Sequence, residues 1–290
     1  MGLRLKFNLA ILAALAAGYL VAVVVLNRVY FDNAREGVLQ NARIMMTAAN
    51  AIRAYTVEEL VPLLPMERDG KFVPATVPAY AAQKNFNKVQ AAVPGFSYRE
   101  AALNPTNLSD RAQDWEADII NAFRNDAAKP ELVVERETPT GPTLHLARPL
   151  VVRDPACLSC HSTSYDAPVA LTRSYGLVNG FGWKLHETIG AQIVTIPMAI
   201  PLELAHRAYV SFLIILLAVF AVVLVTLNLL LHYLVIKPVK RVSGMANAVS
   251  LGEADVETYV KPGKDEISSL SVSFDRMRQS LDHAIQMLKG

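Results

Sequence analysis

The sequence predicts an α+β domain held between two membrane-spanning helices and followed by a helical module. Two segments, residues 7–26 and 208–236, are strongly apolar and contain no Asp, Glu, Lys or Arg. Between them the chain mixes helix-type and strand-type patterns, and after Lys237 apolar residues recur at heptad spacing. The net charge of the 290-residue chain is +2, which argues against a nucleic-acid partner.

Each apolar segment is long enough to cross about 30 Å of hydrocarbon. The first also fits a cleaved signal peptide, because a charged start precedes an apolar middle. Its apolar run is longer than that of a usual signal, and residues 21–26 offer no small-x-small cleavage site. We therefore favour an uncleaved anchor. A buried helix of a soluble protein is the alternative for both segments.

Basic residues flank both apolar segments on the sides away from the central domain. They are Arg4, Lys6, Lys237, Lys240 and Arg241. By the positive-inside rule, both termini are cytoplasmic and the central domain is periplasmic. The expected layout is a two-pass protein of a bacterial inner membrane, with a first helix in residues 1–27, a periplasmic domain in 28–208, a second helix in 209–235 and a cytoplasmic module in 236–290.

The central domain begins with a predicted amphipathic helix over residues 33–64, which Pro62 and Pro65 end. Shorter helices are expected at residues 80–93 and 110–124, with residues 98–102 leading into a turn at 104–107. The predicted strands cover residues 131–137, 143–150 and 190–198, the first two forming a hairpin. A long helix, a small sheet and covering helices suggest a PAS-like sensor domain.

Cys157-Leu158-Ser159-Cys160-His161 reads C-x-x-C-H, the attachment signature of a c-type haem. Each thiol can add to one vinyl group of a single haem, and the histidine then serves as proximal ligand of the iron. The chain has only these two cysteines, which excludes a four-cysteine zinc site. A redox dithiol or an ordinary surface loop are the alternatives. A redox dithiol typically lies between a strand and a helix, whereas the composition of residues 153–168 predicts a Pro/Asp/Ser/Thr-rich loop.

The tail after the second apolar segment resembles a HAMP domain over residues 236–289. The resemblance rests on Lys237-Pro238 at the membrane exit, on Asp265-Glu266 before the second helix, and on two heptad seams joined by a polar connector at 250–263. The seams are Val239, Val242, Ala246 and Val249, and Ile267, Leu270, Phe274, Met277, Leu281, Ala284 and Leu288. The resemblance implies a parallel four-helix bundle made by a homodimer, which relays signals across membranes. An ordinary dimerising coiled coil is the alternative, and it leaves the connector unexplained.

Six segments of the central domain together resemble a bacterial and cyanobacterial family of c-type haem sensor domains. They are residues 52–56 (IRAYT), 103–107 (LNPTN), 147–149 (ARP), 157–161 (CLSCH), 179–183 (NGFGW) and 190–194 (GAQIV). The resemblance covers roughly residues 35–205. It implies a PAS-like fold, one covalent haem c and a role in redox or gas sensing. Such domains are often joined to HAMP and then to output modules. Because this chain ends at Gly290, we expect a kinase, cyclase or chemoreceptor-type partner to read the signal in trans.

A cysteine as second axial ligand, described in that family, cannot be carried over because the chain has no third cysteine. The candidate sixth ligands are Met45, Met46, His145 and His186, and an open sixth position is also possible. Each candidate has a structural alternative, such as core packing for the methionines. Two arginines, Arg53 and Arg148, are candidates to pair with haem propionates or to form ordinary salt bridges. We expect Phe181 and Trp183 to pack the pocket wall.

Two functions compete. A haem sensor would relay a periplasmic signal through HAMP, whereas a membrane-anchored monohaem cytochrome would carry electrons. The HAMP-like tail favours the sensor, because an electron carrier has no need of a dimeric cytoplasmic relay. We expect no enzyme, since no paired acid/base arrangement accompanies the haem motif.

Overall fold

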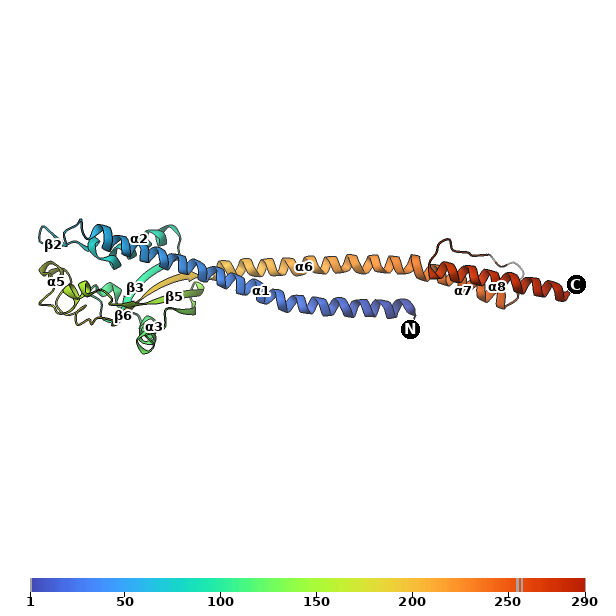
Figure 1. The fold of residues 1–290 in the computed structure, drawn as a ribbon, viewed down its shortest axis with the longest axis horizontal. Coiled ribbons are helices and arrows are strands. Elements are labelled where there is room, and N and C mark those ends of the chain that lie inside the picture. The colour runs from blue at the N-terminus through green and yellow to red at the C-terminus, as the bar shows by residue number, and fades with distance from the viewer. Residues whose placement is uncertain (1, 254–255, 257, 290) are drawn as a thin grey trace. The chain divides into compact units, whose positions relative to one another are not determined.

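The computed structural model describes residues 2–253, 256 and 258–289, and for residues 3, 288 and 289 the backbone only. The chain divides into two compact units, residues 28–208 and residues 1–27 with 209–290. Two long helices, α1 (Leu3–Tyr55) and α6 (Ala199–Leu230), each contribute to both units (Figure 1). The predicted mixture of helix and sheet is confirmed, and each unit is described by itself below.

The unit of residues 28–208 combines the outer part of α1, several short helices and six strands. Its helical segments are η1 (Thr56–Leu60), η2 (Pro74–Thr76), α2 (Pro78–Ala92), η3 (Leu108–Asp110), α3 (Asp114–Asn125), η4 (Pro155–Cys157), α4 (Leu158–His161) and α5 (Val169–Tyr175). Its strands are β1 (Glu67–Arg68), β2 (Lys71–Phe72), β3 (Ser97–Ala102), β4 (Leu132–Thr138), β5 (Gly141–Val151) and β6 (Thr188–Pro197).

Four strands form one antiparallel sheet in the order β3-β6-β5-β4. β4 and β5 make the predicted hairpin, in which Thr138 lies opposite Gly141. β6 lies between β3 and β5, so strands from distant parts of the sequence meet on it. A separate short hairpin of β1 and β2 follows the end of the N-terminal helix.

Each face of the sheet has its own apolar core, because successive strand side chains point to opposite faces. Val194 and Ile196 of β6 pack with residues of α1 and α2, including Met46 and Phe86. Ile193 packs on the other face with residues of α3 (Figure 1). Burial on both faces explains why residues 190–198 read as an almost continuous apolar run.

Three predictions for this unit were incomplete. Residues 98–102, expected to lead into a turn, belong to β3, whose two charged members at positions 99 and 100 hide the strand pattern. The helix expected from residue 110 begins at Asp114, where Glu116 accepts a hydrogen bond from the backbone N–H of Gln113 at 2.7 Å. The long N-terminal helix ends in η1 at Leu60, before both prolines.

In the other unit, α1 and α6 each contain a stretch that is long and apolar enough to cross a membrane, and neither stretch is buried in the chain. Tyr209 Oη lies 3.4 Å from the carbonyl oxygen of Val23, which places the two helices side by side at this point. η5 (Leu231–Ile236) continues α6 and leads into α7.

Two further helices complete this unit, α7 (Lys237–Ser250) and α8 (Glu266–Lys289). Asp265 caps α8 by accepting hydrogen bonds from the backbone N–H and the hydroxyl of Ser268, both at 2.7 Å. Hydrogen bonds from Lys261 and Ser268 lower the pKa of Asp265 to about 2. The two predicted heptad helices are therefore present. Within the predicted connector, residues 254, 255 and 257 lie outside the described residues, as does the side chain of Leu288.

Candidate haem site

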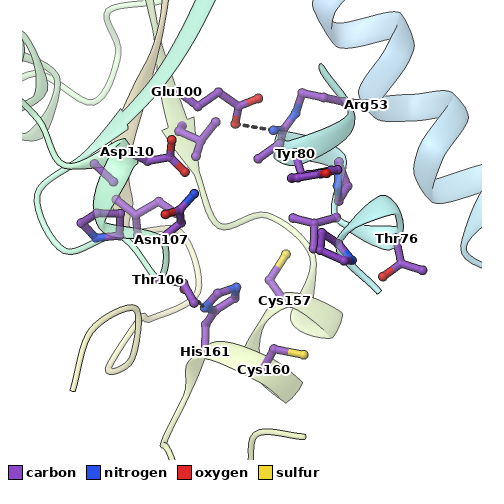
Figure 2. Close-up of a pocket in the computed structure, with 18 of the residues that line it drawn as sticks. Arg53, Thr76, Tyr80, Glu100, Thr106, Asn107, Asp110, Cys157, Cys160 and His161 are labelled. Atoms are coloured by element: carbon purple, nitrogen blue, oxygen red, sulfur yellow. Dashed lines mark hydrogen bonds and ion pairs between the residues drawn. The ribbon is translucent and has the colours of Figure 1, made fainter. Parts of the chain in front are cut away.

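The C-x-x-C-H motif forms one helical turn rather than the irregular loop expected from its composition. Asp154 starts η4, just before this turn, by accepting a hydrogen bond from the backbone N–H of Ala156 at 2.8 Å, and Pro155 occupies the first position of η4. η4 ends at Cys157, and α4 follows it directly. Residues three apart on a helix lie on the same side. Cys157 and Cys160 consequently line the same cavity as His161 (Figure 2).

The His161 ring is held in one tautomer by a backbone carbonyl. Its Nδ1 lies 2.7 Å from the carbonyl oxygen of Gly180, and since a carbonyl can only accept, Nδ1 carries the proton. The other nitrogen, Nε2, is left with a free lone pair, which is the form that binds a metal. Burial lowers the pKa of His161, which also favours the neutral ring. Trp183 stacks on this ring with 3.8 Å between centroids and an angle of 11° between planes.

A polar clamp holds the loop that carries Gly180. The side chain of Asn104 accepts a hydrogen bond from the Gly180 N–H at 3.2 Å and donates one to the Phe181 carbonyl at 3.4 Å. Thr106 Oγ1 lies 3.4 Å from His161 Nδ1. The segments 103–107 and 179–183 therefore act together on the histidine.

Gly180 has no room for a side chain. Its φ is +82°, in the left-handed region that favours glycine, and a Cβ there would lie 2.7 Å from Thr106 Cα. Gly182 has a similar φ of +81° but open space where its Cβ would be. Position 180 thus requires glycine for two reasons, the positive φ and the close packing against Thr106, whereas position 182 requires it only for its φ.

The cavity has a volume of about 550 Å³, within the range of sites for small molecules and cofactors. Its walls are largely aliphatic and aromatic. The apolar side chains that line it include Val57, Val61, Met66, Phe72, Val77, Leu150, Val152, Leu171, Tyr175 and Ile189. η1 and the residues after it supply the first of these, so the outer end of the N-terminal helix forms part of the wall. A flat apolar ligand fits such a lining.

One end of the cavity is polar. Arg53 and Glu100 form an ion pair there, on the side away from His161 in Figure 2. Burial opposes the charge on Arg53, but attraction to Glu100 and Tyr98 outweighs it, and the pKa of Arg53 is raised. Asp110 also lines the cavity, and burial raises the pKa of its carboxyl.

The two arginines predicted to face propionates differ in position. Arg53 lines the cavity and is paired with Glu100. Arg148 lies outside the cavity lining and pairs with Glu131, with 3.2 Å between Nη2 and Oε2. Arg148 therefore forms the ordinary salt bridge that was the alternative to a propionate contact. Trp183 lines the cavity as expected, whereas Phe181 does not.

The structure brings none of the four candidate sixth ligands to the cavity lining. Met46 is fully buried in the core beneath α1, and Met45 packs against that core. His145 is buried on the other face of the sheet, with Nδ1 2.9 Å from Thr195 Oγ1 and its ring on Trp115. His186 is exposed in the loop before β6, at φ +65°. Met66 does line the cavity, although no pattern in the sequence marks it as a candidate ligand.

The donor set fits a covalently attached haem better than a bare metal ion. Across the described part of the chain, no group of three His, Cys, Asp or Glu side chains could hold a metal ion. Two free thiols and one available imidazole nitrogen on an apolar cavity match the thioether and axial bonds of a haem c. Burial raises the pKa of the Cys157 thiol, so it is not primed as a redox thiolate.

Comparison with known proteins defines the class of this chain. The Tll0287-like family model, described as Tll0287, matches residues 32–197, and the HAMP domain model matches residues 230–283. The first match covers more than half of the chain, which therefore belongs to the Tll0287-like family, with a HAMP domain after the family domain. This confirms the predicted order of the two domains.

One solved structure similar to this chain is the crystal structure of the cyanobacterial heme-protein Tll0287. The two share 18% sequence identity over 55% of this chain and 94% of that chain, with a TM-score of 0.43. No curated protein matches the sequence.

Replacing Gly180 with alanine tests the clamp on His161. Both Gly180→Ala and Gly182→Ala impose strain of about 1–3 kcal/mol, because each places a Cβ at positive φ. Gly180→Ala alone also clashes with Thr106, and we expect it to lose about 1–3 kcal/mol more free energy of unfolding. Guanidinium titration of the two variants measures the difference. Equal losses would show that Thr106 does not press on Gly180.

The burial of His145 predicts a loss of stability in acid. Burial, and then the charge of Arg136, lower its pKa to about 4, whereas an unfolded histidine has a pKa of about 6.5. Between these values the unfolded state binds a proton that the folded state does not. Stability therefore falls as the pH drops from about 6.5 to about 4. Melting curves from pH 7 to pH 4 should show a smaller fall for His145→Asn than for the parent. Parallel curves would contradict this assignment.

Proposed function

We propose that this protein is a membrane-bound haem-c sensor that signals through its HAMP domain. The observation that carries the proposal is the helical turn of residues 157–161, which puts two thiols and a tautomer-fixed histidine on one apolar cavity. One haem would be attached through Cys157 and Cys160, with His161 as axial ligand. The Tll0287-like family, to which the chain belongs, shares its name with a cyanobacterial heme-protein, which supports this ligand class.

The protein's own residues have definable tasks in such a site. Gly180 and Trp183 hold the His161 ring in the tautomer that leaves Nε2 free to bind the iron, and the apolar wall would surround the cofactor. A bound haem supplies a one-electron redox change or a site for a small gas. Residues that line the cavity at η1 then sense its state at the end of the N-terminal helix.

The HAMP domain and the two apolar helices support the proposed sensor function. HAMP domains imply signalling to a partner and usually dimerise, and a monohaem electron carrier does not need one. We propose a two-pass inner-membrane protein with residues 28–208 as a periplasmic, PAS-like sensor and both termini in the cytoplasm. The basic residues beside each apolar segment support this orientation. A kinase, cyclase or chemoreceptor-type partner would read the output.

In a host that matures c-type cytochromes, the mass of the parent chain should exceed that of its polypeptide by the mass of one haem. Mass spectrometry of the denatured protein measures this directly. Cys157→Ala and Cys160→Ala should each lose one thioether, and the double variant should carry none, because the remaining haem contacts do not survive denaturation. Ser159→Ala, which keeps both thiols, is the matched control. An unmodified parent chain would overturn the proposed function.

The second heptad helix should mediate dimerisation. α8 buries Ser268 and Ser271, whereas Leu270, Met277 and Leu281 are about half exposed in the single chain. A partner chain would cover these apolar side chains. Phe274→Asp should therefore reduce cross-linking of the tail at least tenfold and leave the haem spectrum unchanged.

Ser273→Asp, at an exposed position of the same helix, is the matched control and should cross-link like the parent. If Phe274→Asp also cross-links like the parent, the tail is not a dimeric relay. The electron-carrier function would then be favoured.

A further inference from the structure

We propose that the Arg53–Glu100 pair sets the reduction potential of the cavity's cofactor and links its oxidation state to α1. The inference rests on the proposed function and deepens it. Both side chains line the cavity, at the end away from His161 (Figure 2). Glu100 comes from the edge strand β3, and Arg53 comes from the helix that continues to the N-terminus.

Burial combined with a place in the cavity lining distinguishes this pair from the other salt bridges of the domain. The Arg99–Glu116 pair is similarly buried, at 33% and 3% exposure, but neither of its residues lines the cavity. The side chain of Glu100 is 4% exposed and that of Arg53 is 27% exposed, whereas those of Arg124 and Glu187 are 38% and 35% exposed. Water screens a buried pair weakly, so its charges act strongly on a charge change nearby. Removing one partner leaves the other uncompensated at the cavity wall.

Hydrogen bonds extend the pair into the sheet. Tyr98 donates to Glu100 Oε1 at 2.7 Å, and Gln192 Nε2 donates to the Tyr98 hydroxyl at 2.9 Å. The same Gln192 Nε2 donates to Asn50 Oδ1 at 2.8 Å. Tyr98 and Gln192 are each less than 10% exposed.

The network thus contacts the helix α1 twice, because Asn50 and Arg53 lie three residues apart on the same side of it. It also holds the central strand β6, which leads at Pro197 towards α6. A force on the ion pair consequently acts directly on the outer end of α1 and, through Gln192, on the strand that precedes α6.

Reduction of a haem adds one electron from an external one-electron donor, so the iron changes from Fe(III) to Fe(II) and no other bond forms or breaks. The carboxylate of Glu100 favours the more positive, oxidised iron, and the guanidinium of Arg53 favours the reduced iron. When the iron loses one positive charge, its attraction to Glu100 and its repulsion of Arg53 both become weaker. The position of the Arg53 side chain, and of the turn of α1 that carries it, then depends on the oxidation state of the iron.

The test is a mediated redox titration of the haem-loaded full chain in detergent. Glu100→Gln keeps the shape of the side chain but leaves Arg53 unpaired. It should raise the equilibrium constant for reduction at least tenfold, which is about 59 mV for one electron. Arg53→Gln should shift the potential in the opposite direction, and the double variant should return towards the parent. Glu131→Gln is the matched control, because Glu131 also pairs with arginines but lies outside the cavity lining.

Hydrogen exchange of residues 50–60 tests the link to the helix. Oxidised and reduced parent protein should differ in exchange there, and the double variant should not. The inference is overturned if haem-loaded Glu100→Gln and Arg53→Gln shift no more than Glu131→Gln, or if the parent exchanges alike in both states. A parent chain without attached haem would overturn the proposed function itself, and the inference with it.

Discussion

The hydrogen bond from His161 Nδ1 to the Gly180 carbonyl is the contact on which the candidate site depends. It leaves Nε2 of the ring available, and it ties the helical turn of the two cysteines to a loop nearly twenty residues later. Asn104, which precedes α3 in the chain, in turn holds that loop through two hydrogen bonds. Three separate segments must therefore fold together before the imidazole can serve as a ligand.

The antiparallel sheet explains how the site is joined to the rest of the chain. β6 is covered on one face by α1 and α2 and on the other by α3, which fixes it as the centre of the domain. The cavity takes part of its wall from η1, at the outer end of α1. The same helix holds Arg53, whose pair with Glu100 reaches the sheet. Ligand site, sheet and long helix thus form one packed unit.

Sequence patterns predicted those elements whose formation depends on residues close together in the chain. The apolar spans, the β4–β5 hairpin, the double-sided strand β6 and the two heptad helices all follow from the spacing of apolar residues. Long-range pairing was harder to predict. β3 was missed because Arg99 and Glu100 interrupt its apolar pattern, and each finds its partner far away in sequence, at Glu116 and Arg53.

The candidate site was predicted in the same uneven way. The motif of residues 157–161 identified the two thiols and the proximal histidine, because its spacing carries the chemistry. The segments 103–107 and 179–183 were recognised as parts of a family pattern, but nothing local showed that they clamp His161. The candidate sixth ligands were chosen by residue type alone. Met46 and His145 proved to belong to the two cores, since strand and helix faces, which residue type does not encode, decide which side chains reach the cavity.

The role of His161 is tested most directly by replacing its ring and returning it as a free molecule. In His161→Gly the two thioethers should still hold the haem, while its absorption spectrum loses the features of imidazole ligation. Added imidazole should restore the parent spectrum, because the cavity beside Trp183 then has room for the ring. A His161→Gly protein whose spectrum equals that of the parent before imidazole is added would contradict the account.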